Sequence, residues 1–252
     1  MKKLFLKILF VSLLQSFFVS NAQISQLFRN KDRVEQREEQ DTYPFSYGFF
    51  LNLNNFDYKM VLNPKYGMYN NQNLVQSKPT YSFGAGLIAR MRLNDNFDLR
   101  LEPGLQFVDR ELTFDTQVKS AELTLTNAHR IRKVKSTYVD VPLLLEFHMD
   151  RWYNSRPYVA GGFNYMMNLQ SNAKSADDNQ QGIFRSTTHN FGWSAEMGIQ
   201  FYFSRFKLTP GFRGTFFFNN EMVADNAGTP PYWTAAINTM QTRAFMFVLK
   251  FE

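Results

Sequence analysis

Ten charged side chains fall at alternate positions in segments that are otherwise rich in Phe and Leu. They are Arg90, Arg92, Asp98, Arg100, Glu102, Asp140, Glu146, Glu196, Lys207 and Arg213. Alternation with a period of two indicates β-strands and places these charges on one face of each strand. Opposite charges on a shared face can form ion pairs, or they can line a path for protons and ions. Which of the two applies depends on whether that face is enclosed.

The remaining residues give little support for a catalytic site. The chain has no cysteine and only three histidines, His129, His148 and His189, which fall on different segments. We find no Ser–His spacing on one face, no phosphate-binding glycine loop and no histidine pair at metal-ligand spacing. We therefore expect a protein that is not an enzyme and has no catalytic residue, cofactor or metal. A protease or lipase at a barrel rim is the unsupported alternative.

Eight segments share the alternation. They are residues 45–53, 81–93, 97–107, 137–148, 157–169, 191–203, 206–218 and 243–251. Eight strands of about ten residues fit either a soluble ligand-binding barrel or an outer-membrane barrel.

The volume of the side chains decides between these two barrels. An eight-stranded barrel is only just wide enough for its inward side chains. The chain has 27 Phe, concentrated on the apolar positions, whereas eight of its 13 Gly share the positions of the charges. The Phe face must therefore point outward, where only lipid can cover it. The sequence predicts an all-β fold, an eight-stranded antiparallel transmembrane β-barrel of the outer-membrane type.

The connections between the segments alternate in length. Residues 54–80, 109–136, 170–190 and 219–242 form long connections, and residues 94–96, 149–156 and 204–205 form short ones. Outer-membrane barrels have short periplasmic turns and longer extracellular loops. We therefore expect the long connections outside the cell and both termini in the periplasm.

The N-terminus has the anatomy of a secretory signal. Lys2, Lys3 and Lys7 precede an apolar run, and small residues follow it at 20–22, so we expect a signal peptide over 1–22. Without its three lysines the formal charge of +6 falls to +3, which does not suggest a nucleic-acid partner. Residues 23–44 are predicted to be a charged periplasmic leader, either a tether or a docking segment, and residues 45–252 the barrel. No later segment is long and apolar enough for a helical membrane anchor.

The lumen charges are expected to form a structural network of ion pairs. Counting back from the short connections places Glu196 opposite Arg213 and Arg92 opposite Asp98, but Arg90 opposite Arg100, which needs acids from other strands. The candidate members are Arg90, Arg92, Asp98, Arg100, Glu102, Asp140, Glu146, Glu196 and Arg213. A proton or ion path is the functional alternative, but a narrow barrel fills its interior with side chains, which favours a plug.

Two Pro–Gly pairs interrupt the alternation at equivalent places. Pro103 and Gly104 follow one short connection, and Pro210 and Gly211 follow another. Proline cannot donate to a β-ladder. We expect a β-bulge or a lumen water at both pairs, with glycine giving room for a bend. The alternative is that each proline lies where no donor is needed.

One basic cluster, "HRIRKVKS" at 129–136, stands out in the long connections. It could bind the phosphates of lipopolysaccharide, although a solvated extension of a strand is the more frequent meaning of such a run. Outer-membrane lipid and lipopolysaccharide are the partners that a barrel surface implies. No nucleic acid or small-molecule substrate is indicated.

Four stretches give the chain a family resemblance. They are "YGFFLNLNNFDYKM" at 47–60, "NDNFDLRLEPGLQFVDREL" at 94–112, "VKSTYVDVPLLLEF" at 134–147 and "RPYVAGG" at 156–162. With these stretches the chain resembles the PorT family of outer-membrane barrels, called SprT in gliding bacteria. The resemblance implies a role in type IX protein secretion and gliding motility, through contacts with other secretion proteins. It brings no catalytic residue. A small porin-like or adhesin-type barrel is the alternative.

Overall fold

The computed structural model describes residues 37–115, 119–120, 123–124, 130–226 and 233–252. The predicted signal peptide, residues 23–36 of the predicted leader, and His129 lie outside these ranges. Among the described residues, no helix has the length and apolar character needed to cross a membrane.

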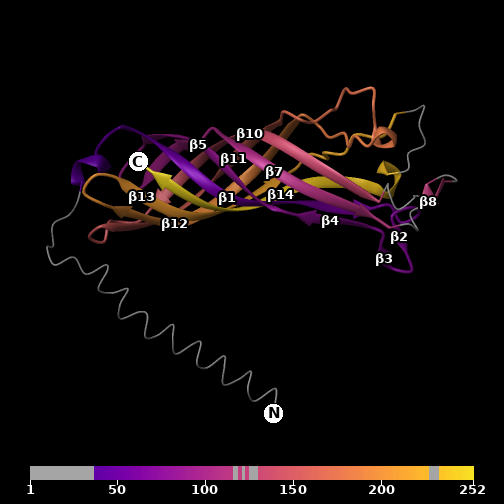
Figure 1. Cartoon of the computed structure of the whole chain (residues 1–252). Coiled ribbons are helices and arrows are strands. Elements are labelled where there is room, and N and C mark those ends of the chain that lie inside the picture. The colour runs from indigo at the N-terminus through magenta and orange to yellow at the C-terminus, as the bar shows by residue number, and fades with distance from the viewer. Residues whose placement is uncertain (1–36, 116–118, 121–122, 125–129, 227–232) are drawn as a thin grey trace, which may run out of the picture. The chain divides into compact units, whose positions relative to one another are not determined.

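The strands form one closed antiparallel ring (Figure 1). They are β1 (Phe45–Leu62), β4 (Val75–Pro79), β5 (Tyr81–Arg92), β6 (Phe97–Leu101), β7 (Gly104–Phe114), β10 (Ile131–His148), β11 (Ser155–Asn168), β12 (His189–Tyr202), β13 (Lys207–Phe217) and β14 (Ile237–Phe251). Because β4 leads into β5 and β6 into β7, the ring has eight strands, and β1 closes it by pairing with both β14 and β5. The predicted eight-stranded antiparallel barrel is confirmed.

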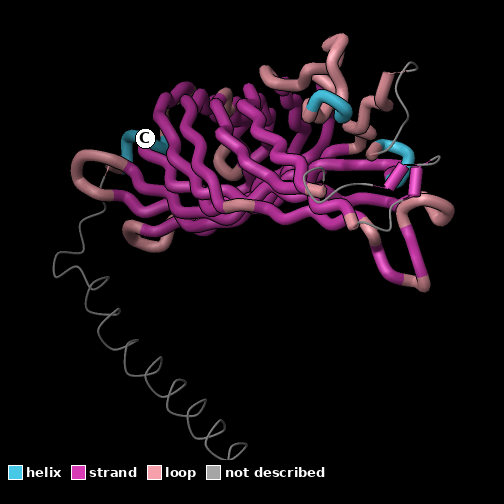
Figure 2. The backbone as a smooth tube through the Cα atoms, turned by 45° about the vertical axis from the view of Figure 1, so that its right-hand side comes forward, coloured by secondary structure: helices cyan, strands magenta, loops and turns pink. Residues whose placement is uncertain are grey.

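The two ends of the barrel differ in their connections (Figure 2). Turns of a few residues join β5 to β6, β10 to β11 and β12 to β13 at the end that we call the short-turn end. The opposite, long-loop end carries two hairpins and two 3-10 turns. These are the hairpin of β2 (Met68–Tyr69) and β3 (Gln72–Asn73), the hairpin of β8 (Lys119–Ser120) and β9 (Leu123–Thr124), and the 3-10 turns η3 (Asn179–Gln181) and η4 (Thr234–Ala236).

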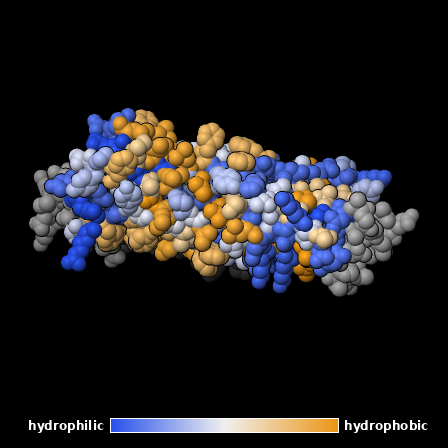
Figure 3. Space-filling model, turned by 90° about the horizontal axis from the view of Figure 1, so that it is seen from above, coloured by the Kyte–Doolittle hydropathy of each residue, from blue (hydrophilic) through white to orange (hydrophobic). Residues whose placement is uncertain are grey.

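The two faces of the strands have the predicted polarity over the half of the barrel next to the short-turn end. Outward side chains there are large and apolar, such as Phe163 at 76% exposure and Phe212 at 66%. Inward neighbours such as Asn164 and Arg213 are 2% and 1% exposed. Figure 3 shows the apolar side chains gathered over this part of the surface. An apolar surface of this extent is stable only in lipid, so we call this part the membrane section.

The strands continue beyond the membrane section, where loops are predicted. Residues 54–62, 75–79, 109–114, 131–136 and 237–242 were expected in long connections but belong to β1, β4, β7, β10 and β14. The period of two persists, but the polarity reverses. On β1 the outward positions change from Leu53 to Asp57 and Lys59, and the inward ones from Asn54 to Tyr58. The predicted strands end too early because the prediction required apolar residues on the outward face of each strand. We call this part the strand extension.

The interior of the strand extension is an apolar core of the kind found in soluble proteins. Tyr58, Leu62, Leu74, Val75, Leu112, Phe114, Val134, Phe184, Trp233, Ala236, Ile237 and Met240 form it. It draws on strands as well as on the loops of the long-loop end, which fold back over the barrel.

The register at both Pro–Gly pairs is continuous, so neither pair has the bulge that was one of the two arrangements expected there. The register is the same on both sides of Pro103, from Ala89↔Leu101 to Gly86↔Gly104. It is likewise unbroken from Thr209↔Lys250 to Gly211↔Val248 around Pro210. The Pro103 carbonyl still accepts from the Leu87 N–H at 2.9 Å, so only the reciprocal bond is missing.

The glycines of these pairs make room for an aromatic ring rather than a bend. A Cβ at Gly86 would lie 2.5 Å from the Phe50 ring, and one at Gly104 would lie 2.7 Å from it. The second pair repeats the arrangement, because a Cβ at Gly211 would lie 2.6 Å from the Tyr158 hydroxyl. Each glycine therefore lets an aromatic side chain from a nearby strand lie close to the backbone.

A register irregularity does occur next to a different proline. Between the pairs Gly84↔Gln106 and Pro79↔Arg110, the β4–β5 strand advances five residues while β7 advances four. The extra residue turns β4 toward β7, and β1 pairs with β5 only as far as Asn55↔Tyr81. This irregularity lies where the membrane section passes into the strand extension.

Candidate functional site

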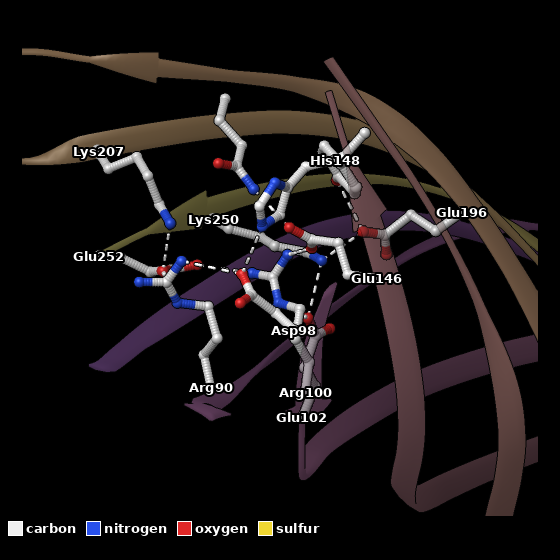
Figure 4. Close-up of polar contacts among 12 residues, drawn as sticks. Arg90, Asp98, Arg100, Glu102, Glu146, His148, Glu196, Lys207, Lys250 and Glu252 are labelled. Carbon is white, nitrogen blue, oxygen red and sulfur yellow. Dashed lines mark hydrogen bonds and ion pairs between the residues drawn. The ribbon is translucent and has the colours of Figure 1, made fainter. Parts of the chain in front are cut away.

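A buried network of charges fills the lumen toward the short-turn end (Figure 4). Five cations, Arg90, Arg100, Lys207, Arg213 and Lys250, meet five acids, Asp98, Glu102, Glu146, Glu196 and Glu252. We call these ten residues the lumen network. Its members come from β5, β6, β10, β12, β13 and β14, together with Glu102 and Glu252 beside the strands. Equal numbers of the two charges make it neutral overall.

The part of the network deeper in the membrane section is built on Arg213. Its guanidinium pairs with Glu102 and, at 2.5 Å, with Glu196, which lies opposite it on the neighbouring strand. Lys250 Nζ lies 2.8 Å from Glu102 Oε1 and also pairs with Glu196. The Tyr158 hydroxyl donates to Glu196 at 2.7 Å. All four charged side chains have 0% exposed area. Each of the two carboxylates therefore contacts both cations and no bulk water.

The part nearer the short-turn end is built on Glu252. Its carboxylate lies 2.6 Å from Arg100 Nη2 and 2.6 Å from Lys207 Nζ. Arg100 also pairs with Glu146, and Arg90 pairs with Asp98 at 3.0 Å. Arg90 and Arg100 stand opposite each other in the register. Their like charges are neutralised because each arginine pairs with acids from other strands.

Two predicted members lie outside the network. Arg92 stands opposite Asp98 in the register, but its guanidinium pairs with Asp95 of the adjoining turn and is partly exposed at the rim. Asp140 is 1% exposed and forms no ion pair among the described residues, although Arg213 and the side-chain amides of Asn164 and Gln106 lie near it. It lies toward a belt of amides and hydroxyls in which Asn54 donates to Gln106 at 3.0 Å and Asn164 to Ser194 at 3.1 Å.

Sequence reasoning missed three participants near the short-turn end. Lys250 and Glu252 belong to the network, and His148 Nε2 lies 3.2 Å from Asp98 Oδ2. The signal was present, because Lys250 alternates with Leu249 and Phe251 and therefore shares the inward parity. For residues 243–251, the sequence-based prediction considers only the apolar positions and does not assign the inward ones.

Aromatic and aliphatic side chains, which we call the aromatic layer, lie in the lumen on both sides of the amide belt: on β1, Phe50 precedes Asn54 and Phe56 follows it. The layer consists of Phe50, Phe56, Ile88, Val108, Tyr138, Met166, Phe217, Ala244, Met246 and Val248, all at most 5% exposed. The rings of Phe56 and Tyr138 stack with centroids 5.8 Å apart. Six of its members lie on the long-loop side of the amide belt, and their close packing leaves no room for water between the lumen network and the long-loop end. They are Phe56, Val108, Tyr138, Met166, Phe217 and Ala244.

A second, smaller charged group lies beyond that layer. The Arg110 guanidinium stacks on the Tyr58 ring at 3.8 Å and donates to the Tyr138 hydroxyl and, at 2.9 Å, to Thr242 Oγ1. Glu221, from the loop between β13 and β14, accepts the Thr242 N–H at 3.2 Å. Burial raises the pKa of Glu221 above its usual value, against the opposing charge of Arg110.

The short-turn end is crossed by residues 37–44, which we call the mouth strap. It contains the 3-10 turn η1 (Glu38–Asp41). Arg90 donates to the Gln40 carbonyl at 3.2 Å, and Gln40 is 5% exposed. Asp41 accepts from the Tyr202 hydroxyl at 2.7 Å and pairs with Arg151 and Arg156. The strap thus covers the end of the lumen network.

The described residues hold ion pairs but no constellation for covalent chemistry. No group of three or more His, Cys, Asp or Glu among them is placed to hold a metal ion. His189 and Tyr165 share a hydrogen bond of 2.8 Å on the outer surface, remote from His148 in the lumen. The described part of the lumen is occupied by ion pairs and packed side chains.

A closed ring of eight antiparallel strands with an apolar belt and a packed polar interior is the construction of a transmembrane β-barrel. A family model described as "Outer membrane protein beta-barrel domain" matches residues 21–223. The chain belongs to this family of outer membrane β-barrel proteins. A comparison with curated proteins found no match.

Several solved structures are similar in fold. Neisserial surface protein A (NspA) is 10% identical, with 82% of this chain and 98% of that chain covered and a TM-score of 0.39. OprG from Pseudomonas aeruginosa is 12% identical, with 81% and 94% covered and a TM-score of 0.41. Ail of Yersinia pestis is 10% identical, with 83% and 99% covered and a TM-score of 0.39.

Proposed function

We propose that this outer membrane barrel is a non-enzymatic component of type IX protein secretion, of the PorT type, and that it works through contacts with other proteins rather than by conduction. The filled lumen carries the proposal. The lumen network and the aromatic layer together fill the same narrow interior, and a route for solutes would have to disrupt both. A barrel of this kind can contribute only its surfaces.

Three of the four stretches that resemble PorT lie on neighbouring strands of the ring, which supports the resemblance. "NDNFDLRLEPGLQFVDREL" covers β6 and β7, "VKSTYVDVPLLLEF" lies on β10, and "RPYVAGG" lies on β11. These strands are consecutive neighbours. The fourth stretch, "YGFFLNLNNFDYKM", lies on β1, on the other side of β5.

We further propose that the short-turn end faces the periplasm and the long-loop end faces outward. Short periplasmic turns and longer external loops are the usual arrangement in bacterial barrels. Both the mouth strap and Glu252 lie at the short-turn end, which would place the termini of the barrel in the periplasm. A strap on that side is available to periplasmic secretion proteins.

The long-loop end supports a second candidate, a surface adhesin. The β2–β3 hairpin presents Tyr69 at 54% exposure beside Asn70 and Asn71, whose φ angles of 47° and 61° form its tight turn. Exposed tyrosine with adaptable amides is a composition suited to binding surfaces.

Deletion of the gene followed by assay of cargo that carries a type IX C-terminal domain tests the secretion role. Loss of cargo from the surface, restored by the intact gene, is the expected result. Normal export would remove the secretion role and leave the adhesin candidate. Steady channels from the purified protein in planar bilayers would contradict the non-conducting lumen.

A further inference from the structure

The mouth strap reaches across the barrel to the wall opposite its own strand. It leads directly into β1, whose neighbours are β5 and β14. Asp41, however, contacts Arg156 on β11, the fourth strand from β1 in either direction around the ring of eight. In Figure 1, η1 lies at the end of the barrel where the chain's C-terminus is marked. The strap is therefore anchored at both sides of the short-turn mouth.

The far anchor is a preorganised carboxylate site. Asp41 Oδ1 accepts from the Tyr202 hydroxyl at 2.7 Å and lies 3.3 Å from Arg156 Nη1, and Asp41 Oδ2 lies 3.4 Å from Arg151 Nη1. The Arg151 guanidinium stacks on the Tyr202 ring at 3.8 Å. Tyr202 and Arg156 are 3% and 9% exposed. Two guanidinium groups and one phenol, held by their own packing, thus converge on a single carboxylate.

This site differs from the lumen network in how easily its anion can be replaced. The network acids are enclosed among cations, and Glu102, Glu146, Glu196 and Glu252 have 0% exposed side chains. The Asp41 side chain is 18% exposed, and that of Arg156 is 11% exposed. Among the described residues, Asp41 is the only acid within ion-pair distance of Arg156. Water therefore reaches the Asp41 carboxylate but not those of the four network glutamates, so another carboxylate can take the place of Asp41 without opening the lumen network.

We propose that Arg151, Arg156 and Tyr202 form a docking site for an acidic peptide segment and that Asp41 occupies it as a displaceable latch. The strap sequence around Asp41, "EEQDTY", is itself an acidic segment bound to a basic mouth. A partner segment that inserts its own carboxylate releases the strap and uncovers Gln40. This inference deepens the contact role proposed above and rests on it for the side of the membrane that the partner approaches.

Strap release can be measured with a single thiol. The chain has no cysteine, so Gln40→Cys introduces a unique thiol at a position that is 5% exposed. In the full chain in detergent micelles, we expect slow labelling by a maleimide and labelling about tenfold faster when Asp41→Asn is added. The matched control is Glu39→Gln, because Glu39 is an exposed strap carboxylate bonded to Tyr43 at 3.4 Å. It should leave the rate unchanged. Equal rates with and without Asp41→Asn would overturn the latch.

Docking can be measured with a labelled peptide that copies residues 38–43 and a second peptide with Asn in place of its Asp. By fluorescence polarisation, the Asp41→Asn chain should bind the acidic peptide about tenfold more tightly than the parent chain does. The Asn peptide should bind weakly, and Arg156→Gln added to Asp41→Asn should abolish binding. Equal affinity for the two peptides would overturn the carboxylate site.

The labelling and peptide-binding results can be distinguished from the result of the cargo-export assay. Normal cargo export in the deletion strain would end the secretion proposal and leave peptide binding in micelles intact. A folded Asp41→Asn chain that binds no acidic peptide would end the docking site even if export depends on the gene. Retention of the heat-modifiable folded band on gels shows that each variant is folded.

Discussion

The membrane section and the strand extension use the same strands with opposite polarity. On β1, Leu51 and Leu53 point outward with 49% and 64% exposure while Asn52 and Asn54 point inward with 4% and 1%. A few residues further on, Lys59 points outward and Leu62 inward. The parity of the strand never changes. What changes is the solvent outside, so the side of the wall that must be apolar follows the surroundings rather than the fold.

The two interiors consequently hold together by different forces. The membrane section is filled with charges that neutralise one another, whereas the strand extension is filled with an apolar core. Removing one member of a buried ion pair leaves its partner uncompensated, but truncating an apolar side chain leaves a cavity. The first two substitutions below test this difference.

Arg213→Ala should have the largest effect. It leaves Glu102 and Glu196 with fewer cations in a fully buried site, and we expect a loss of roughly 3–5 kcal/mol of unfolding free energy. Urea unfolding in lipid vesicles, followed by tryptophan fluorescence, measures it. Arg92→Ala at the rim is the control and should cost about 0–1 kcal/mol. Similar losses for the two variants would show that the network contributes no special stability.

Leu112→Ala should cost about 3 kcal/mol through a cavity in the apolar core of the extension, because Leu112 is fully buried there. We expect the loss to appear as local opening. Hydrogen exchange should quicken in the extension of β7 and β10 while the membrane section stays protected. Uniform acceleration along both strands would mean that the two regions unfold as one unit.

Leu51→Lys and Val61→Lys compare the two outer surfaces on one strand. Both residues point outward from β1, with exposures of 49% and 52%. A lysine facing lipid should cost about 2 kcal/mol, whereas a lysine facing water should stay within roughly 0.5 kcal/mol of the parent. The same vesicle unfolding assay gives both values. Equal costs would place the edge of the lipid belt beyond Val61.

Gly86→Ala and Gly161→Ala compare the inner and outer sides of the membrane section. A Cβ at Gly86 would lie 2.4 Å from the Pro103 carbonyl oxygen, but one at Gly161 meets nothing closer than 3.8 Å. Overpacking should make Gly86→Ala less stable by about 1–3 kcal/mol. Gly161→Ala should be neutral. A neutral Gly86→Ala would argue against the close seating of the Phe50 ring.

The smallest effect should come from pH acting on Glu221 at the long-loop end. Its pKa is raised by burial, so the folded state favours the protonated form, and the stability that this carboxyl contributes is lost as pH rises through the raised pKa. Glu221→Gln should be slightly more stable than the parent above that pH and no different at acidic pH. Thermal midpoints at several pH values test this, and a difference that grows toward low pH would contradict it.

Much of the fold follows from local pattern alone. The period of two locates Phe45 at the start of the first strand, and the short connections align Glu196 with Arg213 and Arg90 with Arg100. Turn length is enough to set the register of a hairpin. Side-chain partners beyond the hairpin are not set in this way. Arg100 pairs with Glu146 and Glu252, and these contacts can be identified only once the ring is closed.

Two errors have physical causes that also lie beyond local sequence. Proline at 103 suggested a bulge, but a single missing N–H is tolerated when the carbonyl of the same residue still pairs with Leu87. The strand extension was interpreted as loop because its outward residues are polar, and only the core packed inside it shows that it is strand.

By itself the sequence determined that this chain is a barrel with an apolar, lipid-facing exterior and with small and charged side chains inside. Side-chain volume and alternation allow no other closed arrangement. The tertiary structure alone decided which charges meet, how far the wall rises beyond the lipid, and that Asp41 crosses the mouth to Arg156. Those outcomes depend on residues brought together from opposite sides of the ring, and no spacing along the chain encodes such a distance.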